Sequence, residues 1–379
     1  MSLEYRICTR CIMDTSDPEI SFDESGACNH CRQHDRFIAD HVPVGEEAES
    51  QLKALVQRIK EKGKGKKYDC IIGLSGGVDS TYVALLVKRL GLRPLAVHLD
   101  NGWNSELAVQ NVENIVNKLG FDLYTIVINW EEFKALQLAY LKAGVVDLEA
   151  TSDHAIVATM YKLGKEHDIH FVIGGTNFAT ESILPKSWYY QRKDDLVNLK
   201  DILKKFGSGI KLKTFPTLGF PKLVYYNIFH RVEWISILNL VSYIKEDVKN
   251  EIKEVLNWKD YGGKHHESII TKFYQSYILP QKFGYDKRRA HLSSLICSGQ
   301  ITRAEALAEM DANVYKNKEE LENDIEYIIK KLGISRQEFD DIITGEKREH
   351  DSFRNDLWQR KLFYGSIDLL KSFKRKFGK

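Results

Sequence analysis

The sequence has little of what marks disordered, secreted or membrane-spanning chains. Only 7 of its 379 residues are proline, which leaves little room for a proline-rich disordered chain. Residues 1–10 mix charge with cysteine and contain no apolar core, so no signal peptide is visible. The most apolar stretch, residues 234–244, is too short to span a bilayer and has charged flanks. We expect a cytoplasmic protein without membrane insertion, and we interpret residues 234–244 as a buried or partner-facing amphipathic helix.

An excess of charge of one sign is also lacking. Lysine plus arginine number 55 and aspartate plus glutamate 53, which gives a net charge of +2. This balance argues against a protein that grips long nucleic acid by charge alone, although a local basic patch remains open. We therefore expect no nucleic-acid partner. With 43% hydrophobic and 28% charged residues, the composition is that of a globular protein, and its length suggests two or three domains.

Four of the six cysteines form two C-x-x-C pairs near the start of the chain. They are Cys8, Cys11, Cys28 and Cys31. This spacing is typical of a tetrahedral four-thiolate Zn²⁺ site, and a closed shell of four thiolates predicts a structural role. Two alternatives remain open. A pair of disulfides would require an oxidising compartment, and an iron–sulfur cluster also uses four cysteines.

Beyond the cysteines, strand and helix patterns alternate. Apolar runs predict strands at residues 70–74, 94–99, 123–128 and 171–173, and helical patterns lie at residues 46–62, 81–90, 106–119, 131–141 and 153–166. This alternation predicts an α/β fold with a parallel sheet and helices on both faces. From residue 258 the chain reads as mainly helical, with capping boxes at Thr302 to Glu305 and Ser335 to Glu338. We expect a zinc-binding module at residues 1–40 and a core at residues 41–185. A substrate or partner region that continues the core would follow at residues 186–310, and a helical extension at residues 311–379.

The turn after the first predicted strand has the sequence Ser75-Gly76-Gly77-Val78-Asp79-Ser80. Two glycines let backbone amides approach a phosphate closely, and the helix that follows directs its positive end to the same place. Ser75 and Ser80 add hydroxyl groups, and the carboxylate of Asp79 suits Mg²⁺ or the ordering of the loop. A plain strand-to-helix turn is the alternative. The match of five positions directly after an apolar run favours a phosphate site.

This motif resembles the PP-loop of the ATP pyrophosphatases, which split ATP into AMP and pyrophosphate. The resemblance implies an adenine nucleotide α-hydrolase-like fold, with further nucleotide loops after later strands. His98-Leu99-Asp100-Asn101-Gly102 and Gly174-Gly175-Thr176-Asn177 occupy those positions. The expected ATP-binding residues are therefore Ser75, Gly76, Gly77, Asp79, Ser80, His98, Asn101, Gly175, Thr176 and Asn177.

The wider chain resembles the N-acetyl sugar amidotransferases. The resemblance rests on the two C-x-x-C pairs joined to the PP-loop, on Glu149-Ala150-Thr151-Ser152-Asp153-His154, and on residues 287–295. It implies an ATP- and Mg²⁺-dependent ligase that converts the acetamido group of a nucleotide-linked sugar into an acetamidino group through an O-adenylated intermediate. It further implies a role in bacterial lipopolysaccharide, O-antigen or other surface-glycan biosynthesis, and a separate glutaminase with an ammonia channel as partner.

The resemblance suggests catalytic roles for Asp79, Asp100, Asp153, Lys287 and Arg288. Asp153, or Glu149, would accept a proton from the incoming ammonia. Asp153 has an alternative role as a helix cap together with Ser152. Lys287 and Arg288 would neutralise phosphate charge, or would lie on a solvated helix face.

Two other functions remain open. A PP-loop tRNA sulfur transferase would need a reactive cysteine in the core, where only Cys70, within an apolar strand, and Cys297, without a nucleophile setting, are available. A zinc-module scaffold protein with an inactive nucleotide site is the second alternative, and the intact Ser75, Asp79 and Ser80 argue against it.

Overall fold

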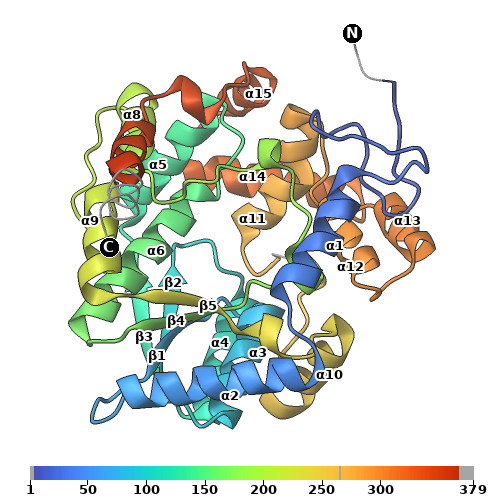
Figure 1. Cartoon of the computed structure of the whole chain (residues 1–379). Coiled ribbons are helices and arrows are strands. Elements are labelled where there is room, and N and C mark those ends of the chain that lie inside the picture. Colours follow the sequence, from blue (N-terminus) through green and yellow to red (C-terminus); the bar gives the residue numbers. More distant parts are fainter. Residues whose placement is uncertain (1–3, 264–265, 367–379) are drawn as a thin grey trace.

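A five-stranded parallel sheet forms the centre of the computed structural model, which describes residues 4–263 and 266–366 (Figure 1). The strands lie in the order β3-β2-β1-β4-β5, and each neighbouring pair is parallel. Their bounds are β1 Cys70–Gly73, β2 Pro94–Asp100, β3 Asp122–Val127, β4 Phe171–Gly174 and β5 Glu233–Ser236. The four predicted strands are confirmed. Because β2 and β4 flank β1, the carboxyl ends of β1 and β4 form the switch point at which such sheets bind ligands.

Helices cover both faces of this sheet, as the sequence predicts. Side chains alternate along a strand, so Cys70 and Ile72 of β1 pack into one apolar cluster while Ile71 packs into another. The first cluster is covered by α2 Gly45–Lys62, α3 Val78–Arg89, α4 Glu106–Leu119 and α10 Lys245–Leu256. The second is covered by α5 Trp130–Ala143, α6 Ala150–Glu166 and α8 Leu196–Phe206.

Strand β5 lies in a segment that we interpreted as helical, and this interpretation is wrong. Residues 233–236 extend along β4, with Phe171 opposite Glu233 and Ile173 opposite Ile235. A single 3₁₀ turn, η3 Ile237–Leu240, follows. An apolar run of this length does not by itself distinguish a strand from a helix. Pairing with β4 is a tertiary interaction, and the hydrophobic pattern of the sequence does not reveal it.

The remaining elements lie before, between and after those that form the sheet and its covering helices. Among them are α1 Asn29–His41, α7 Phe178–Glu181, η1 Lys186–Trp188, α9 Phe220–Tyr225, the π-helical turn η2 Tyr226–His230, α11 Ile269–Phe273, the π-helical η4 Tyr274–Phe283, α12 Arg288–Cys297, α13 Arg303–Asp311, α14 Lys318–Leu332, α15 Arg336–Thr344 and η5 His350–Ser352. Thr302 and Glu305 form the predicted reciprocal capping box, and Ser335 accepts a hydrogen bond from the amide of Glu338. The helical C-terminal region is thus confirmed. Residues 367–379 of the predicted extension lie outside the described part of the chain.

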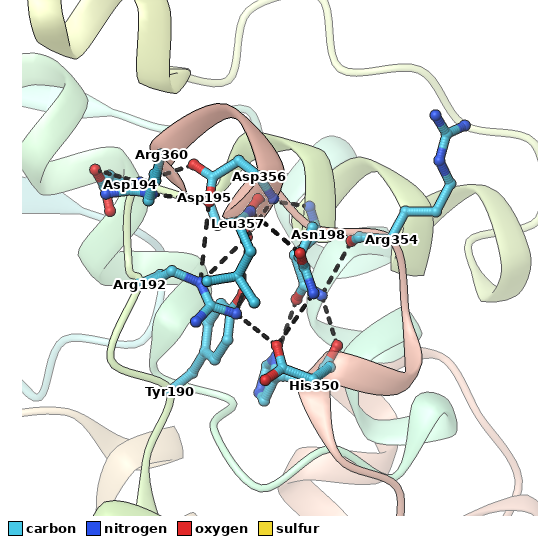
Figure 2. A network of polar contacts seen from close by, with 12 residues as sticks. Tyr190, Arg192, Asp194, Asp195, Asn198, His350, Arg354, Asp356, Leu357 and Arg360 are labelled. Atoms are coloured by element: carbon cyan, nitrogen blue, oxygen red, sulfur yellow. Dashed lines mark hydrogen bonds and ion pairs between the residues drawn. The ribbon is translucent and has the colours of Figure 1, made fainter. Parts of the chain in front are cut away.

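A polar network attaches the C-terminal segment to the core (Figure 2). The hydroxyl of Tyr190 and the amide of Asp356 both donate to the carboxylate of Asp195, at 2.7 and 3.1 Å. Asn198 donates to the carbonyl of His350 at 2.8 Å. Asp195 and Asp356 are buried, and Arg360 forms two hydrogen bonds to the Asp356 carboxylate. Buried charges stay stable only when they are paired in this way. Among residues 4–263 and 266–366, no helix combines the length and apolar character that a membrane span requires.

Candidate active site and metal centre

The turn between β1 and α3 requires glycine at position 76. Its φ of +83° lies in the left-handed region, and a Cβ atom there would stand 2.6 Å from the carbonyl oxygen of Ala108 in α4. Gly77 is the N-cap of α3, which has no side-chain cap. The free amides at the start of this 12-residue helix therefore lie at the carboxyl edge of the sheet, where they can bind a phosphate group.

The two serines of the turn are in contact with each other. The Oγ atoms of Ser75 and Ser80 are 3.1 Å apart. Ser75 accepts a hydrogen bond from the amide of Gly77 at 3.2 Å, and Ser80 donates to the carbonyl of Gly77 at 3.2 Å. The structure thus brings together the residues that the motif predicted as one site, with both hydroxyl groups ordered by the loop itself.

Three aromatic residues from later in the chain hold this loop, and the sequence analysis missed them. Trp258 donates to the carbonyl of Gly76 at 2.8 Å. Tyr243 donates to the carboxylate of Asp79. The hydroxyl of Tyr261 would stand 3.2 Å from a Cβ atom at position 77. Burial and the neighbouring Asp79 carboxylate raise the pKa of Tyr243, so its hydroxyl keeps the proton that it donates. Trp258 and Tyr243 lie 182 and 164 positions from their partners, and no local pattern signals such contacts.

The loop after β4 lies directly against the turn after β1. A Cβ atom at Gly175 would stand 3.0 Å from the Cβ of Asp79, so this close approach also requires glycine. The hydroxyls of Thr176 and Ser236 are 2.8 Å apart, and Ser236 is the last residue of β5. Asn177 accepts hydrogen bonds from the amide and hydroxyl of Thr180 and thereby caps α7. The predicted second nucleotide loop therefore adjoins the first, although its asparagine side chain is used as a helix cap.

The loop after β2 supplies the third edge of the site. His98 is buried, with Nδ1 2.7 Å from the carbonyl oxygen of Leu74 and Nε2 3.1 Å from Nδ2 of Asn104. Since a carbonyl only accepts, Nδ1 carries the ring proton and His98 supports the chain just before Ser75. Asp100 accepts from the amide of Gly102, and Asn101 donates to the hydroxyl of Ser152 at 3.3 Å. The Asn101–Ser152 bond connects this loop to the start of α6.

At the start of α6, Asp153 is joined to a lysine that the sequence analysis did not identify. Nζ of Lys193 lies 3.1 Å from the Asp153 carboxylate and 2.5 Å from that of Asp147. Asp153 lies inside α6 and does not cap it, and the amide of Ala150, the first residue of the helix, donates to Asp147. Burial raises the pKa of Asp153, while the positive charge of Lys193 lowers it in part. Burial opposes the charge on Lys193, but the Asp153 and Asp147 carboxylates outweigh it and raise the lysine's pKa.

The adjacent basic residues at the start of α12 serve different partners. Lys287 forms an ion pair of 2.7 Å with Glu149, which also accepts from Gln275 at 3.0 Å. All three guanidinium nitrogens of Arg288 donate hydrogen bonds, to the Asp286 carboxylate and to carbonyls at the end of α13. Of the two predicted cationic site residues, the structure therefore brings Lys287 to the start of α6 and turns Arg288 toward α13.

The four predicted cysteines form one buried cluster in which all four sulfurs lie within 4.8 Å of one another. The Sγ distances are 3.8 Å for Cys8–Cys31 and 3.7 Å for both Cys11–Cys28 and Cys28–Cys31. A tetrahedral site with Zn–S bonds of ~2.3 Å has edges of ~3.8 Å, so the cluster matches the size of a zinc site. A disulfide would bring two sulfurs to ~2.05 Å, and all six cysteines are free thiols here. The donor set suits a structural metal ion bound by four thiolates.

The cysteine module packs on the helices that follow the site. Arg303 donates to the carbonyls of Cys11 and Cys8 at 3.0 and 3.1 Å. Arg289 donates to the carbonyl of Ile12 at 2.6 Å, which fixes the module to α12. The cysteine module therefore contacts α12, whose first turn is next to Lys287.

Two family models match the chain. Residues 47–225 match the NAD synthase family, and residues 267–363 match the family described as LPS biosynthesis protein WbpG-like, C-terminal domain. The first match contains the loops after β1, β2 and β4 together with the start of α6. The second contains α11 through α15 and Lys287.

The chain is also similar to proteins of established name. It is 35% identical over 102 residues to a glutamine-hydrolysing GMP synthase of Pyrobaculum aerophilum, covering 27% of this chain and 19% of that protein. It is 28% identical over 163 residues to the tRNA(Ile)-lysidine synthase of Chlamydia pneumoniae, covering 41% and 46%. The chain thus spans less than half the length of these relatives. Among solved structures, the NMN synthetase of Francisella tularensis shares 16% identity and a TM-score of 0.36 over 77% of this chain and 95% of that one.

Proposed function

Because the chain belongs to the PP-loop ATP pyrophosphatase superfamily and its residues 267–363 to the WbpG-like family of lipopolysaccharide biosynthesis proteins, we propose that it is an ATP-dependent amidotransferase. Its substrate is a nucleotide-linked sugar, and it converts an acetamido group of that sugar into an acetamidino group. The observation that carries the proposal is the Asn101–Ser152 bond, which joins the nucleotide edge of the sheet to the acid–lysine cluster at the start of α6.

The amide oxygen of an acetamido group is a poor leaving group, so ammonia cannot displace it directly. Transfer of AMP from ATP to this oxygen gives an O-adenylated imidate and releases pyrophosphate. In this proposal the amides and hydroxyls of residues 75–80 bind the pyrophosphate portion, and Asp79, Asp100 and Asn101 contact Mg²⁺, ribose or the reacting amide. Mg²⁺ supplies charge neutralisation for the departing pyrophosphate. Ammonia then attacks the activated carbon and AMP leaves.

Ammonia must lose protons as it becomes the amidine nitrogen. Asp153 accepts a proton in this proposal, because its carboxylate lies beside Lys193 at the start of α6. Burial raises its pKa, and the positive charge of Lys193 lowers it in part. Lys287, held by Glu149, neutralises phosphate charge at the same edge. No protein nucleophile is required, since orientation and charge neutralisation supply the rate enhancement.

The ammonia comes from a separate glutaminase. Neither cysteine outside the metal cluster has the setting of a glutaminase nucleophile. Cys70 is fully buried at the start of β1, the end of the strand opposite the Ser75 loop, and burial raises the pKa of its thiol. Cys297 lies against Cys31 of the metal cluster. The exposed side chains of Tyr225, Phe229 and Trp234 offer an apolar face to such a partner.

The proposal is tested by incubating the protein with Mg-ATP, ammonium chloride and a UDP-linked diacetamido sugar. We expect AMP, pyrophosphate and a sugar product lighter by the difference between an oxygen atom and an NH group. UDP-glucose, which has no acetamido group, serves as the matched control and yields no AMP. AMP formed equally with UDP-glucose contradicts amide activation.

The two other functions predict different outcomes in the same assay. A tRNA sulfur transferase releases AMP only when tRNA is present, and it needs a thiol near the adenylate. The positions of Cys70 and Cys297 argue against it. A scaffold protein gives no turnover with any acceptor, and the ordered contact between Ser75 and Ser80 argues against a decayed nucleotide site.

A further inference from the structure

The metal cluster has a fifth sulfur beside it. Cys297, the last residue of α12, places Sγ 3.7 Å from Sγ of Cys31. This distance equals the Cys28–Cys31 separation, so Cys297 approaches Cys31 as closely as another ligand does. A tetrahedral zinc shell is complete with four thiolates, which leaves one of these five thiols without a place in it. Helices α1 and α12, which carry the two residues, lie side by side (Figure 1).

The fifth thiol differs from the other four in its exposure. Cys8, Cys11, Cys28 and Cys31 are 0% exposed, whereas Cys297 is half-buried. An oxidant in solution therefore reaches Cys297 first.

We propose that Cys297 is an oxidation site whose product is a disulfide with Cys31, formed by hydrogen peroxide at the expense of metal binding. Peroxide first converts the Cys297 thiol into a sulfenic acid and releases water. The thiolate of Cys31 then attacks the sulfenic sulfur, the S–S bond forms, and hydroxide leaves. Two thiol sulfurs lose two electrons in all, and one peroxide molecule accepts them.

The disulfide removes one thiolate from the metal shell. A zinc ion with three thiolates and an open position exchanges its ligands more readily than a closed four-thiolate site. The effect would extend beyond the metal, because α12 also binds α7 next to the Gly175–Asn177 loop. His291 lies 2.8 Å from the carbonyl oxygen of Thr180, and Ser298 donates to the carbonyl of Ala179 at 2.8 Å. This inference does not depend on the proposed sugar chemistry.

The test follows zinc release from the purified zinc-loaded protein with a chromogenic chelator during a titration with hydrogen peroxide. We expect the wild-type protein to release zinc at least about tenfold faster than Cys297→Ser, because the substituted side chain cannot form a sulfenic acid. Peptide mapping of the oxidised wild type should show a Cys31–Cys297 crosslink that dithiothreitol reverses. Equal rates of release from both proteins, or a crosslink between other cysteines, overturn the proposal.

Two controls separate this chemistry from loss of structure. Cys70→Ala removes a buried thiol in β1 and should release zinc at the wild-type rate. Should Cys297→Ser fold poorly, brief alkylation of the folded wild type tests the same point, since Cys297 is the one thiol of the five that is not fully buried. Alkylated protein that keeps its zinc under peroxide supports the proposal, and alkylated protein that loses zinc as fast as untreated protein contradicts it.

Discussion

Tyr243 donates a hydrogen bond to the carboxylate of Asp79, although 164 positions separate them in the chain. Tyr243 follows β5 and η3, and Asp79 lies in the first turn of α3. The bond therefore spans the switch point of the sheet and holds the one acidic side chain of the β1 turn. Tyr243 is buried and Asp79 is half-buried, so the hydrogen bond between them is partly shielded from water.

Replacing Tyr243 by phenylalanine should misplace Asp79 without emptying the space around it. We expect kcat/KM for ATP in the AMP-forming assay to fall about tenfold, and Asp79→Ala to abolish AMP formation with its metal content unchanged. Tyr82→Phe is the matched control, because this substitution also removes a tyrosine hydroxyl. The ring centroids of Tyr82 and Tyr243 are 5.8 Å apart, so the control lies in the same region. Equal losses in both phenylalanine variants would remove the Asp79 contact from the explanation.

Gly76 should not tolerate alanine, for two separable reasons. Its φ of +83° is strained for any other residue, and the added Cβ would stand 2.6 Å from the Ala108 carbonyl. Gly120, with a φ of +65° and no atom within 4 Å of its Cβ position, shares only the first reason. We expect Gly120→Ala to lower the free energy of unfolding by ~1 kcal/mol. Gly76→Ala should lower it by a further ~1–3 kcal/mol and abolish ATP binding. Urea denaturation compares the two, and equal losses would argue against the contact with α4.

The loops of the site are predictable from the sequence because each follows an apolar strand within a few residues. Ser75, Asn101 and Gly175 belong to such loops, and parallel strands bring their carboxyl ends to one edge. Lys193 is not predictable in this way, since it reaches Asp153 from 40 positions later and from outside any regular element.

Lys287, Arg288 and Arg289 show a second limit. Successive side chains on a helix point about 100° apart, so neighbours in the sequence meet different parts of the fold. Lys287 reaches Glu149, Arg288 caps α13, and Arg289 binds the cysteine module. The sequence shows three adjacent cations, and only the packing of α12 assigns each one a partner.

The cysteine cluster should bind about one zinc ion per chain. Removal of the ion with a chelator should lower the melting temperature, because the free energy of metal binding to the four buried thiolates then no longer stabilises the fold. Metal analysis of purified Cys11→Ser should show loss of zinc, while Cys70→Ala, outside the cluster, retains it. Iron in place of zinc would overturn this assignment of the metal.

Lys193 should set the pH at which the proposed base works. A base is active when deprotonated, so activity falls as the pH drops through its pKa. Loss of the lysine charge removes the main influence that lowers the pKa of Asp153, and that pKa then rises further. The acidic limb of the kcat/KM profile should move to higher pH in Lys193→Met and return toward its wild-type position in Lys193→Arg. A limb at the same pH in all three proteins would exclude Asp153 as the titrating group.

His350 should make the fold sensitive to acid. It is buried against the Tyr190 ring at 4.1 Å, and burial lowers its pKa to about 4. Asp147 and Asp351 favour its charged form, while Lys193 and Arg192 oppose it. An unfolded histidine titrates near ~6.5, so the unfolded state gains its proton first as the pH falls. The free energy of unfolding that the neutral, buried His350 contributes above pH ~6.5 is therefore lost as the pH drops from about 6.5 to about 4. Between pH 7 and 5 this residue should account for ~2 kcal/mol of the decline in unfolding free energy.

Urea denaturation of His350→Gln should show a smaller decline in unfolding free energy than the wild type. His41→Gln, at an exposed position, should show the same decline as the wild type. If the unfolding free energy of His350→Gln declined as much as that of the wild type, other groups would be responsible for the acid sensitivity.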